Sequence, residues 1–401
     1  RFTSKVTDMA YMFNICPNLI SIDVSNFNTQ KVTNMYSMFS FCQLLNIIDV
    51  SKFVTENVVD MSKMFDNCFS VKSLNLYKFN TKNVKDMSFM FNNCNGLNNL
   101  DLSNDFDTSE VTDMQLMFYN CKLLTSLDLS MFNTHNVENF SGMFGYCTGL
   151  TNLDLSSFID NQAVNMTSMF ISCSSLTSLD ISNMDTSQVT TMNNMFFNCF
   201  SLRHLDLKNF NTKKVKDMSY MFAGCGKIES IEINSDNFDT SQVTDMSHSF
   251  QGCSSLEAFD LSKFDMKNVQ NMQSMFLDCK NLKNLDTENI QTDSATEFVY
   301  LFSNCEKLTY LNLKNFNFGK VTNMAFMFQN CISLTSIDFP QDLSAPVTNL
   351  CGMFQSCYSL ENLDLSGLST GEVTNMANMF KDCGKLKELK INNFDTSSVN
   401  D

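Results

Sequence analysis

The sequence predicts an α/β repeat solenoid of about fifteen turns, in which each turn of about 26 residues contributes one short helix and one short parallel strand. Three observations predict this fold. A Phe-x-x-Cys motif recurs fifteen times, and twelve of its fourteen intervals are 26 residues long. Within each repeat, the spacing of apolar residues changes from a helical period to a strand period. The motif phenylalanines are residues 13, 39, 65, 91, 118, 144, 170, 196, 222, 250, 276, 302, 328, 354 and 380.

The first element of each repeat is expected to be a short helix. In the first repeat Val6, Met9, Met12, Phe13 and Cys16 follow a three-and-four spacing, which places them on one helical face. Twenty-five of the 28 methionines and fifteen of the 16 cysteines occupy fixed positions of the repeat. Met and free Cys are adaptable buried hydrophobes, and one Cys per turn lacks the paired spacing of a zinc site. We therefore interpret these residues as core.

The cysteines are expected to be buried free thiols. Identical positions on stacked parallel elements rarely meet the geometry that a disulfide requires.

The second element is expected to be a short strand. Ile22 and Val24 alternate with Asp23 and Ser25, and Phe27 follows. Neither element can bury its apolar side alone, so the repeats should stack into a parallel sheet backed by helices, with a continuous core between them. An all-strand parallel β-helix is the alternative geometry, and the spacing of Met9, Met12, Phe13 and Cys16 speaks against it.

No linker or change of composition divides the chain, so residues 1–401 are expected to form a single continuous solenoid. The two longer intervals, around Asn104-Asp105 and Ser235-Asp236-Asn237, fall in the same part of the repeat and predict a surface loop. The chain opens and stops in the middle of the pattern, which we interpret as an excerpt of a longer protein.

The segment from Leu124 to Ser130 reads LTSLDLS, and it resembles the strand segment of leucine-rich repeats. The asparagine usual in that pattern is replaced by an aromatic residue, as at Phe27 and Phe53. A threonine recurs two residues later, as at Thr29 and Thr55. We expect its hydroxyl to replace part of the asparagine's hydrogen bonding and to cap the following helix.

The full pattern LDLSxFxTxxVTxMxxMFxxC is similar to the 26-residue form of the BspA-like leucine-rich-repeat surface proteins, which is found in bacterial surface lipoproteins. The resemblance covers the whole chain. It implies a solenoid at the cell surface or outside the cell, with roles in adhesion or in binding a host or matrix. It brings no catalytic residues, so the chain is not expected to be an enzyme.

Charge narrows the classes of partner. The formal net charge of −16 argues against nucleic acid and against anionic membrane surfaces, since phosphate binding needs a basic surface. The sequence contains no run of 18 apolar residues that would span a bilayer.

The outward positions of the predicted strands carry a column of carboxylates. Stacked strands would place neighbours about 5 Å apart, where each pair repels by about 0.9 kcal/mol in water. Ser hydroxyls and backbone amides, bound protons with a raised pKa, or cations such as calcium could offset this repulsion. The acids that form this acidic stripe are Asp23, Asp49, Asp101, Asp128, Asp154, Asp180, Asp206, Asp260, Asp286, Asp338 and Asp364.

Several departures from the pattern are candidates for special patches. Tyr77 and Tyr310 are the outward aromatics expected at a binding surface, because Tyr is enriched at hot spots. Other departures are His204 with Lys208, Glu388 with Lys390 and Asn392, the replacements Ala295, Phe298 and Leu301, and the prolines Pro340 and Pro346.

Two functions follow from these observations. The first is an extracellular or cell-surface scaffold that binds a protein, glycan or matrix partner through its exposed sheet face and loops. The alternative is a structural rod or filament subunit that self-associates and has no dedicated ligand site. No cofactor is expected, with calcium along the acidic stripe as the one open option.

Overall fold

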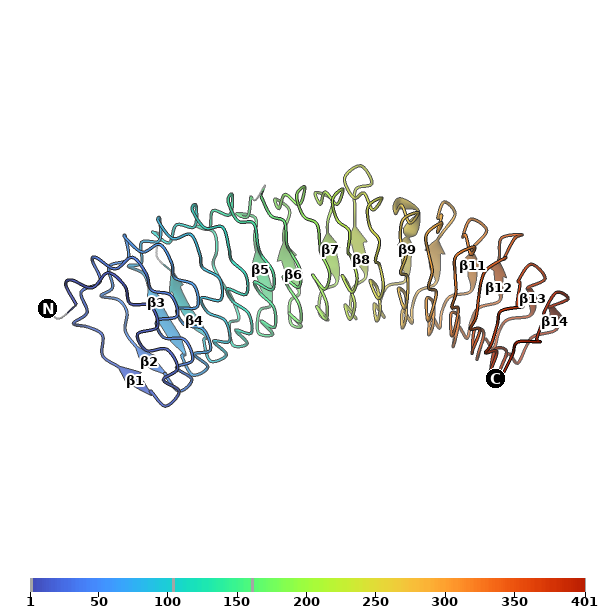
Figure 1. Cartoon of the computed structure of the whole chain (residues 1–401), viewed down its shortest axis with the longest axis horizontal. Coiled ribbons are helices and arrows are strands. Elements are labelled where there is room, and N and C mark those ends of the chain that lie inside the picture. The colour runs from blue at the N-terminus through green and yellow to red at the C-terminus, as the bar shows by residue number, and fades with distance from the viewer. Residues whose placement is uncertain (1–2, 103–104, 160–161, 401) are drawn as a thin grey trace. The chain divides into compact units, whose positions relative to one another are not determined.

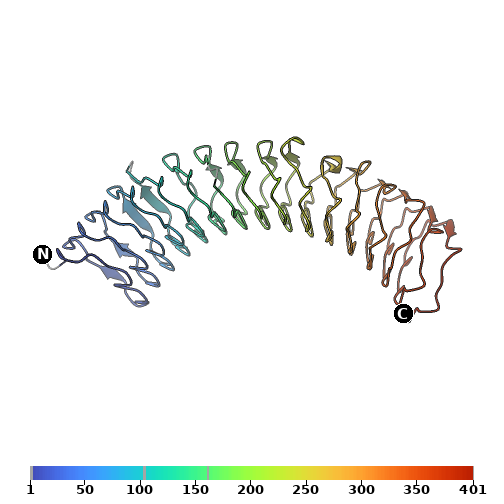
Figure 2. The same cartoon turned by 45° about the horizontal axis from the view of Figure 1, so that its top comes forward.

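A computed structural model describes residues 3–102, 105–159 and 162–400, and each repeat forms one coil (Figure 1). The chain divides into two compact units. The N-terminal unit comprises Arg1–Thr191, Met195–Leu202 and Asp206–Phe210, and the C-terminal unit comprises Met192–Asn194, Arg203–Leu205 and Asn211–Asp401. Within each unit successive coils lie side by side, which a second view also shows (Figure 2).

The predicted strands are confirmed in most coils, whereas residues 124–130 form no strand. The strands are two to four residues long and pair in parallel with the strand of a neighbouring coil. In the N-terminal unit β3 (Ser73–Leu76) pairs with β4 (Asn99–Leu102), with Leu74 opposite Leu100. Burial alternates along β3 from exposed to buried, as the period of two requires.

The remaining strands repeat this arrangement at the same place in the coil. Their bounds are β1 Ser21–Ile22, β2 Ile47–Ile48, β5 Asn152–Asp154, β6 Ser178–Asp180, β7 His204–Asp206, β8 Ser230–Glu232, β9 Ala258–Asp260, β10 Asn284–Asp286, β11 Tyr310–Asn312, β12 Ser336–Asp338, β13 Asn362–Asp364 and β14 Glu388–Lys390.

The expected helix in each coil is wrong. Across the described ranges the only helix is η1 (Leu261–Lys263), a single 3-10 turn. The Phe-x-x-Cys segment is a chain of turns, because the residues two before and two after each motif Phe have positive φ. In the second coil these are Ser37, at +52°, and Phe41, at +61°. A left-handed residue every few positions cannot continue a right-handed helix.

These turns give the backbone two alternating sets of hydrogen bonds. In the second coil the N–H groups of Ser37, Phe39 and Phe41 donate to carbonyls of the following coil at 2.8–3.0 Å. The intervening N–H groups donate to the carbonyl three residues earlier in their own coil, at 3.2 Å. The backbone of the segment is therefore satisfied without a helix and is tied to the next coil at every second residue.

The core is built from the predicted columns of Phe, Met and Cys. The motif rings of adjacent coils stack with centroids 5.3–6.0 Å apart in each unit, as Phe39 does on Phe65. Ala295, Phe298 and Leu301, which depart from the pattern, are also fully buried and fill the same core. That departure therefore changes the packing of the core and not the surface.

Most motif cysteines also link two coils. The thiol of Cys147 donates to the carbonyl of Phe118 in the preceding coil at 3.0 Å, and that of Cys173 donates to Phe144 at 3.0 Å. Burial raises the pKa of Cys147 to about 12, so the thiol keeps its proton and remains a donor. The column therefore supplies hydrogen bonds as well as volume.

The threonine column replaces the usual asparagine hydrogen bonds, as predicted, but no helix follows for it to cap. Thr55 is 1% exposed, and its hydroxyl donates to the carbonyl of Asn80 at 2.9 Å. The same hydroxyl accepts from the N–H of Asn80 at 2.8 Å. One side chain thus holds both backbone groups of a residue in the next coil.

The longer interval near Ser235 and Asp236 is an exposed turn, as expected for a surface loop. Asn104, in the other longer interval, lies outside the described residues.

Thr55→Val is expected to destabilise the N-terminal unit by about 1–3 kcal/mol, because it leaves the buried N–H and carbonyl of Asn80 without their partner. Denaturant unfolding measures the change. Thr125→Val alters an exposed threonine and should change stability by less than about 0.5 kcal/mol. Equal effects of the two substitutions would contradict this role of Thr55.

Ile15→Asn is expected to stabilise the first coil by about 1 kcal/mol, since asparagine adopts left-handed backbone more readily than a β-branched residue. Ile15 has φ +57° and is 66% exposed, so little burial is lost. Hydrogen exchange of the Phe13 and Ile15 amides, which donate to the second coil, should slow. Ile20→Asn, at an isoleucine 58% exposed, is the control and should not slow it.

Candidate binding surface

The outward side chains of the strands form one surface in each unit, which we call the strand face. The acidic stripe lies on it at one position per coil. Ten of its eleven carboxylates are exposed and Asp338 is half-buried. Parallel pairing sets Asp154 opposite Asp180 in the N-terminal unit, and Asp260 opposite Asp286 in the C-terminal unit.

Most stripe residues accept from the backbone N–H two residues later, which forms a side-chain turn. Asp338 does not, because Pro340 has no N–H. Oδ1 of Asp154 accepts from the N–H of Ser156 at 2.9 Å, and Asp128 accepts from Ser130 at 3.0 Å. Where asparagine occupies the column the same bond forms, as at Asn75 with the N–H of Tyr77 at 3.0 Å. The column therefore has a structural role that needs a side-chain oxygen but not a charge.

Hydrogen bonds lower the pKa of several stripe carboxylates. Hydrogen bonds from the Ser25 side chain and N–H lower the pKa of Asp23, and Ser51 and Ser156 lower the pKa of Asp49 and Asp154 in the same way. Repulsion from the neighbouring Asp49 raises the pKa of Asp23 by less than these donors lower it. Seryl and backbone donors thus offset the repulsion, and the prediction of protonated stripe residues is wrong for these three.

In the C-terminal unit, lysines and a tyrosine occupy the second oxygen of the stripe carboxylates. Oδ2 of Asp338 accepts from Lys314 Nζ at 2.8 Å and from the Tyr310 hydroxyl at 2.9 Å. Oδ2 of Asp364 accepts from Lys390 Nζ at 3.0 Å. Hydrogen bonds from Ser366, its backbone and Lys390 lower the pKa of Asp364 to about 2. Oδ2 of these two carboxylates is therefore the atom that binds a cationic side chain.

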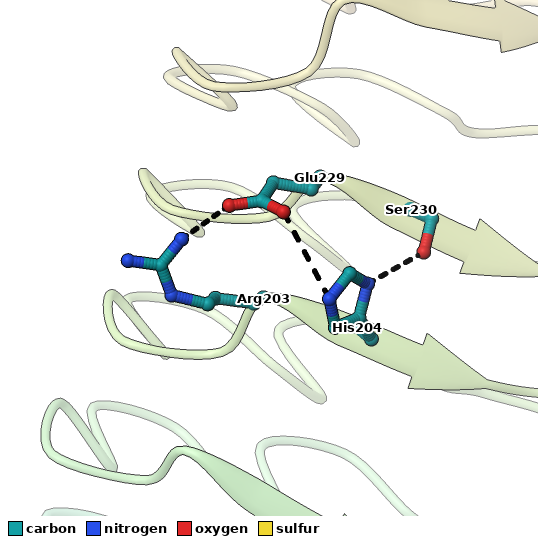
Figure 3. Close-up of polar contacts among 4 residues, drawn as sticks. All are labelled: Arg203, His204, Glu229 and Ser230. Carbon is teal, nitrogen blue, oxygen red and sulfur yellow. Dashed lines mark hydrogen bonds and ion pairs between the residues drawn. The ribbon is translucent and has the colours of Figure 1, made fainter.

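The predicted patch at His204 becomes a four-residue cluster across two coils (Figure 3). Glu229 pairs with Arg203, and its Oε2 lies 3.8 Å from His204 Nε2. Nδ1 of His204 lies 2.9 Å from the Ser230 hydroxyl. The side chains of Arg203, His204 and Glu229 are 44–67% exposed, so water screens the cluster.

The remaining predicted residues lie on the strand face but are not brought together. Tyr77 is 58% exposed in the N-terminal unit, and Tyr310 is 46% exposed in the C-terminal unit. Glu388, Lys390 and Asn392 are exposed on or just after β14. The sequence analysis missed Glu229 and Ser230, although both lie one repeat of 26 residues after Arg203 and His204.

The family described as "Mycoplasma protein of unknown function, DUF285" matches this sequence over residues 2–104, 68–179, 151–256, 226–338 and 338–401. The chain belongs to the DUF285 family. No curated protein matches it closely enough to count as a relative.

Solved structures similar to this DUF285 chain include leucine-rich-repeat proteins of bacteria. A leucine-rich-repeat protein from Bacteroides ovatus is 18% identical, with 95% of this chain and 85% of that chain covered at a TM-score of 0.48. A leucine-rich cell surface protein from Faecalibacterium prausnitzii is 16% identical, with 85% and 80% covered at 0.37. An internalin from Listeria monocytogenes is 14% identical, with 94% and 88% covered at 0.25.

Within residues 3–102, 105–159 and 162–400, His, Cys, Asp and Glu side chains form no group of three or more that could hold a metal ion. Calcium along the acidic stripe stays a prediction. The same ranges form no helix with the length and hydrophobicity needed to cross a membrane.

One carboxylate of the N-terminal unit differs from the stripe because it is buried. Asp66 is 5% exposed, and its Oδ1 accepts from the side-chain amides of Asn67 and Asn92, each at 2.7 Å. Its Oδ2 accepts from the Ser40 hydroxyl at 3.2 Å. Burial raises the pKa of Asp66 by more than these three donors and the charge of Lys63 lower it.

Asp66→Asn is therefore expected to stabilise the unit at neutral pH. A carboxyl with a raised pKa in the folded state contributes stability below its unfolded pKa and loses it as the pH rises through the folded pKa. Asparagine removes the buried charge, and its Oδ1 and Nδ2 can keep all three hydrogen bonds. Unfolding midpoints at pH 7 and below about pH 4 should differ between variant and wild type only at pH 7. Asp49→Asn, at an exposed stripe position with a lowered pKa, should show no such gain.

Proposed function

We propose that the chain is a cell-surface scaffold that binds a basic protein or matrix partner through the strand face of its N-terminal unit. The observation that carries this proposal is the row of exposed carboxylates on that face. Asp128, Asp154 and Asp180 lie in three consecutive coils, each with Oδ1 held by the N–H two residues later at 2.9–3.0 Å. Such fixed carboxylates need no ordering when a partner binds.

The C-terminal unit illustrates how a cationic side chain is received. There Lys314 lies on Oδ2 of Asp338, and Lys390 lies on Oδ2 of Asp364 while Oδ1 of Asp364 remains in its turn. The coils of β5 and β6 present Ser156, Thr151 and Thr177 around the stripe in place of lysines. The same Oδ2 positions in the N-terminal unit therefore suit lysine or arginine side chains of a partner.

The location is supported by the repeat itself. The pattern LDLSxFxTxxVTxMxxMFxxC is similar to that of BspA-like surface proteins, which supports a partner at the cell exterior. Adhesion to a host surface or to matrix is the corresponding role.

A structural rod or filament subunit is the second candidate. The observation that favours it is the regular bonding between coils, in which backbone, threonine and cysteine columns all connect one coil to the next. In that role the acidic stripe has no ligand: its carboxylates only form the turns after the strands and keep the strand face polar.

A triple variant with Asp128, Asp154 and Asp180 changed to Asn tests the binding role. Asn75 and Asn312 make the same turn in this column, so the fold should persist. Binding to an immobilised lysine-rich peptide should weaken about tenfold, since each exposed ion pair contributes up to ~1 kcal/mol. Raising NaCl from about 50 to about 300 mM should reduce the difference between variant and wild type.

The matched control removes three charges from a different corner of the coil. Asp107, Asp185 and Asp265 each accept from the N–H two residues later at 2.8–3.0 Å, and asparagine makes this turn at Asn80. Changing these three to Asn should leave peptide binding nearly unchanged. Equal losses in the two variants would show that net charge alone attracts the peptide, and would leave the structural role as the better account.

A further inference from the structure

The strand exit of one coil in the C-terminal unit departs from all its neighbours in sequence. After β12 the chain reads Phe339-Pro340-Gln341-Asp342-Leu343, where regular coils have a four-residue exit such as Leu129-Ser130-Met131-Phe132. A hollow of about 380 Å³ opens there between this coil and its neighbours, and we call it the exit hollow. Its polar lining consists of Lys314, Asp338, Gln341, Asp364 and Ser366.

The departure is a built feature, because the surrounding residues are adapted to it. Leu343 occupies the place of the usual aromatic, is 3% exposed, and bridges to Leu368 of the next coil. A Cβ on Gly367 would lie 2.8 Å from the carbonyl oxygen of Gln341, so only glycine lets the two segments approach this closely. The ring of Phe339 packs 6.2 Å from that of Phe328.

The fixed charges around the exit hollow balance one another. Lys314 pairs with Asp338 at 2.8 Å, and Lys390 pairs with Asp364 at 3.0 Å. The Tyr310 hydroxyl donates to the same oxygen of Asp338 at 2.9 Å, which holds that carboxylate in place. A charged ligand would meet a like charge beside every opposite one, whereas a neutral polar ligand would meet ordered donors and acceptors.

A regular pair of coils in the N-terminal unit shows what the departure adds. The corresponding hollow at the exit of 127–130 and 154–157 measures about 240 Å³, and Asp128, Ser130, Asp154 and Ser156 supply its polar lining. Its lining contains no lysine and no amide side chain. The exit hollow is larger and adds a lysine and an amide side chain. Both hollows have an apolar wall, formed by Ile337, Phe339 and Pro340 in the exit hollow and by Leu127 and Leu129 in the regular one.

We propose that the exit hollow binds a neutral saccharide. The carboxylates of Asp338 and Asp364 accept from sugar hydroxyls, while Lys314 and the amide of Gln341 donate to sugar oxygens. The hydroxyl proton of Ser366 already bonds Oδ1 of Asp364 at 2.6 Å, so its oxygen accepts from a sugar hydroxyl. The apolar wall covers the C–H face of the ring. The hollow has the size and the few convergent polar groups typical of small-ligand sites. This proposal does not rest on the acidic stripe of the N-terminal unit, which is proposed to bind a basic partner.

Ser366→Tyr tests the proposal by filling the exit hollow. Tyr77 occupies the same position of its own coil, is 58% exposed, and keeps the turn to Asn75, so the column tolerates tyrosine. Ser156→Tyr, at the equivalent position of the regular hollow, is the matched control. Gln341→Ala removes one donor without adding bulk.

The probes are cellotetraose, maltotetraose, N-acetyllactosamine and N-acetylchitotriose, with 3′-sialyllactose and a heparin-derived tetrasaccharide as charged comparisons. Saturation-transfer NMR and calorimetry are expected to show binding of at least one neutral probe and weaker binding of both charged ones. Ser366→Tyr should reduce that affinity at least about tenfold, and Gln341→Ala by about fivefold, as the loss of one hydrogen bond implies. Ser156→Tyr should leave it unchanged.

Binding of none of the neutral probes, tighter binding of a charged probe, or equal affinity in wild type and Ser366→Tyr would each overturn the proposal. The N-terminal stripe variant, with Asp128, Asp154 and Asp180 changed to Asn, is measured with the same saccharides and should bind them as wild type does. The proposed peptide binding and the proposed saccharide binding are therefore tested separately, and either can be contradicted without the other.

Discussion

The structure of each unit depends on the way backbone N–H groups alternate between two partners. Every second N–H of the Phe-x-x-Cys segment donates to the next coil, and the others close turns of three residues within their own coil. This alternation requires left-handed residues at fixed places, such as Lys63 and Asn67 around Phe65. Non-glycine residues pay about 1–2 kcal/mol for that conformation, and the bonds between coils offset the cost. The turns and the stacking of coils therefore stabilise each other, and neither is expected without its neighbours.

The side-chain columns follow from this backbone. Each coil repeats the preceding coil at the spacing of parallel strands. A polar side chain that recurs in every repeat therefore lies beside the same side chain of the neighbouring coil. Thr55 and Cys147 use that proximity to bond carbonyls of the adjacent coil. Asn93 and Asn120 do so through their amides, with Asn120 Nδ2 donating to Asn93 Oδ1 at 2.7 Å. Carboxylates cannot bond to copies of themselves, so stripe residues such as Asp154 accept instead from the backbone N–H two residues later in their own coil.

The sequence was sufficient for the period, the strands and the core, because apolar side chains must recur wherever a coil is buried. It misled on the helix, since the spacing of Met9, Met12, Phe13 and Cys16 arises equally from consecutive three-residue turns. The signal against a helix was present two residues after the motif Phe, where Asn, Asp or Gly is common, as at Asn67, Gly224 and Asp278. The pairing of Arg203 with Glu229 follows from the 26-residue interval. The position of Gln341 could not be predicted in this way, because its segment is irregular and has no equivalent in the other repeats.

Regularity also decides where this architecture can acquire specific recognition. A coil that copies its neighbours presents the same groups again and again, which suits an extended partner and contacts of one kind. A coil that departs from the repeat pattern must pack against the coils on either side, and this packing requires matching changes in their residues. Gly367 faces the carbonyl of Gln341, and Leu343 bridges to Leu368. Surface drift between copies would need no such matching changes. A departure with matched neighbours is therefore stronger evidence for a site than an unusual exposed residue such as Tyr77, around which the coils remain regular.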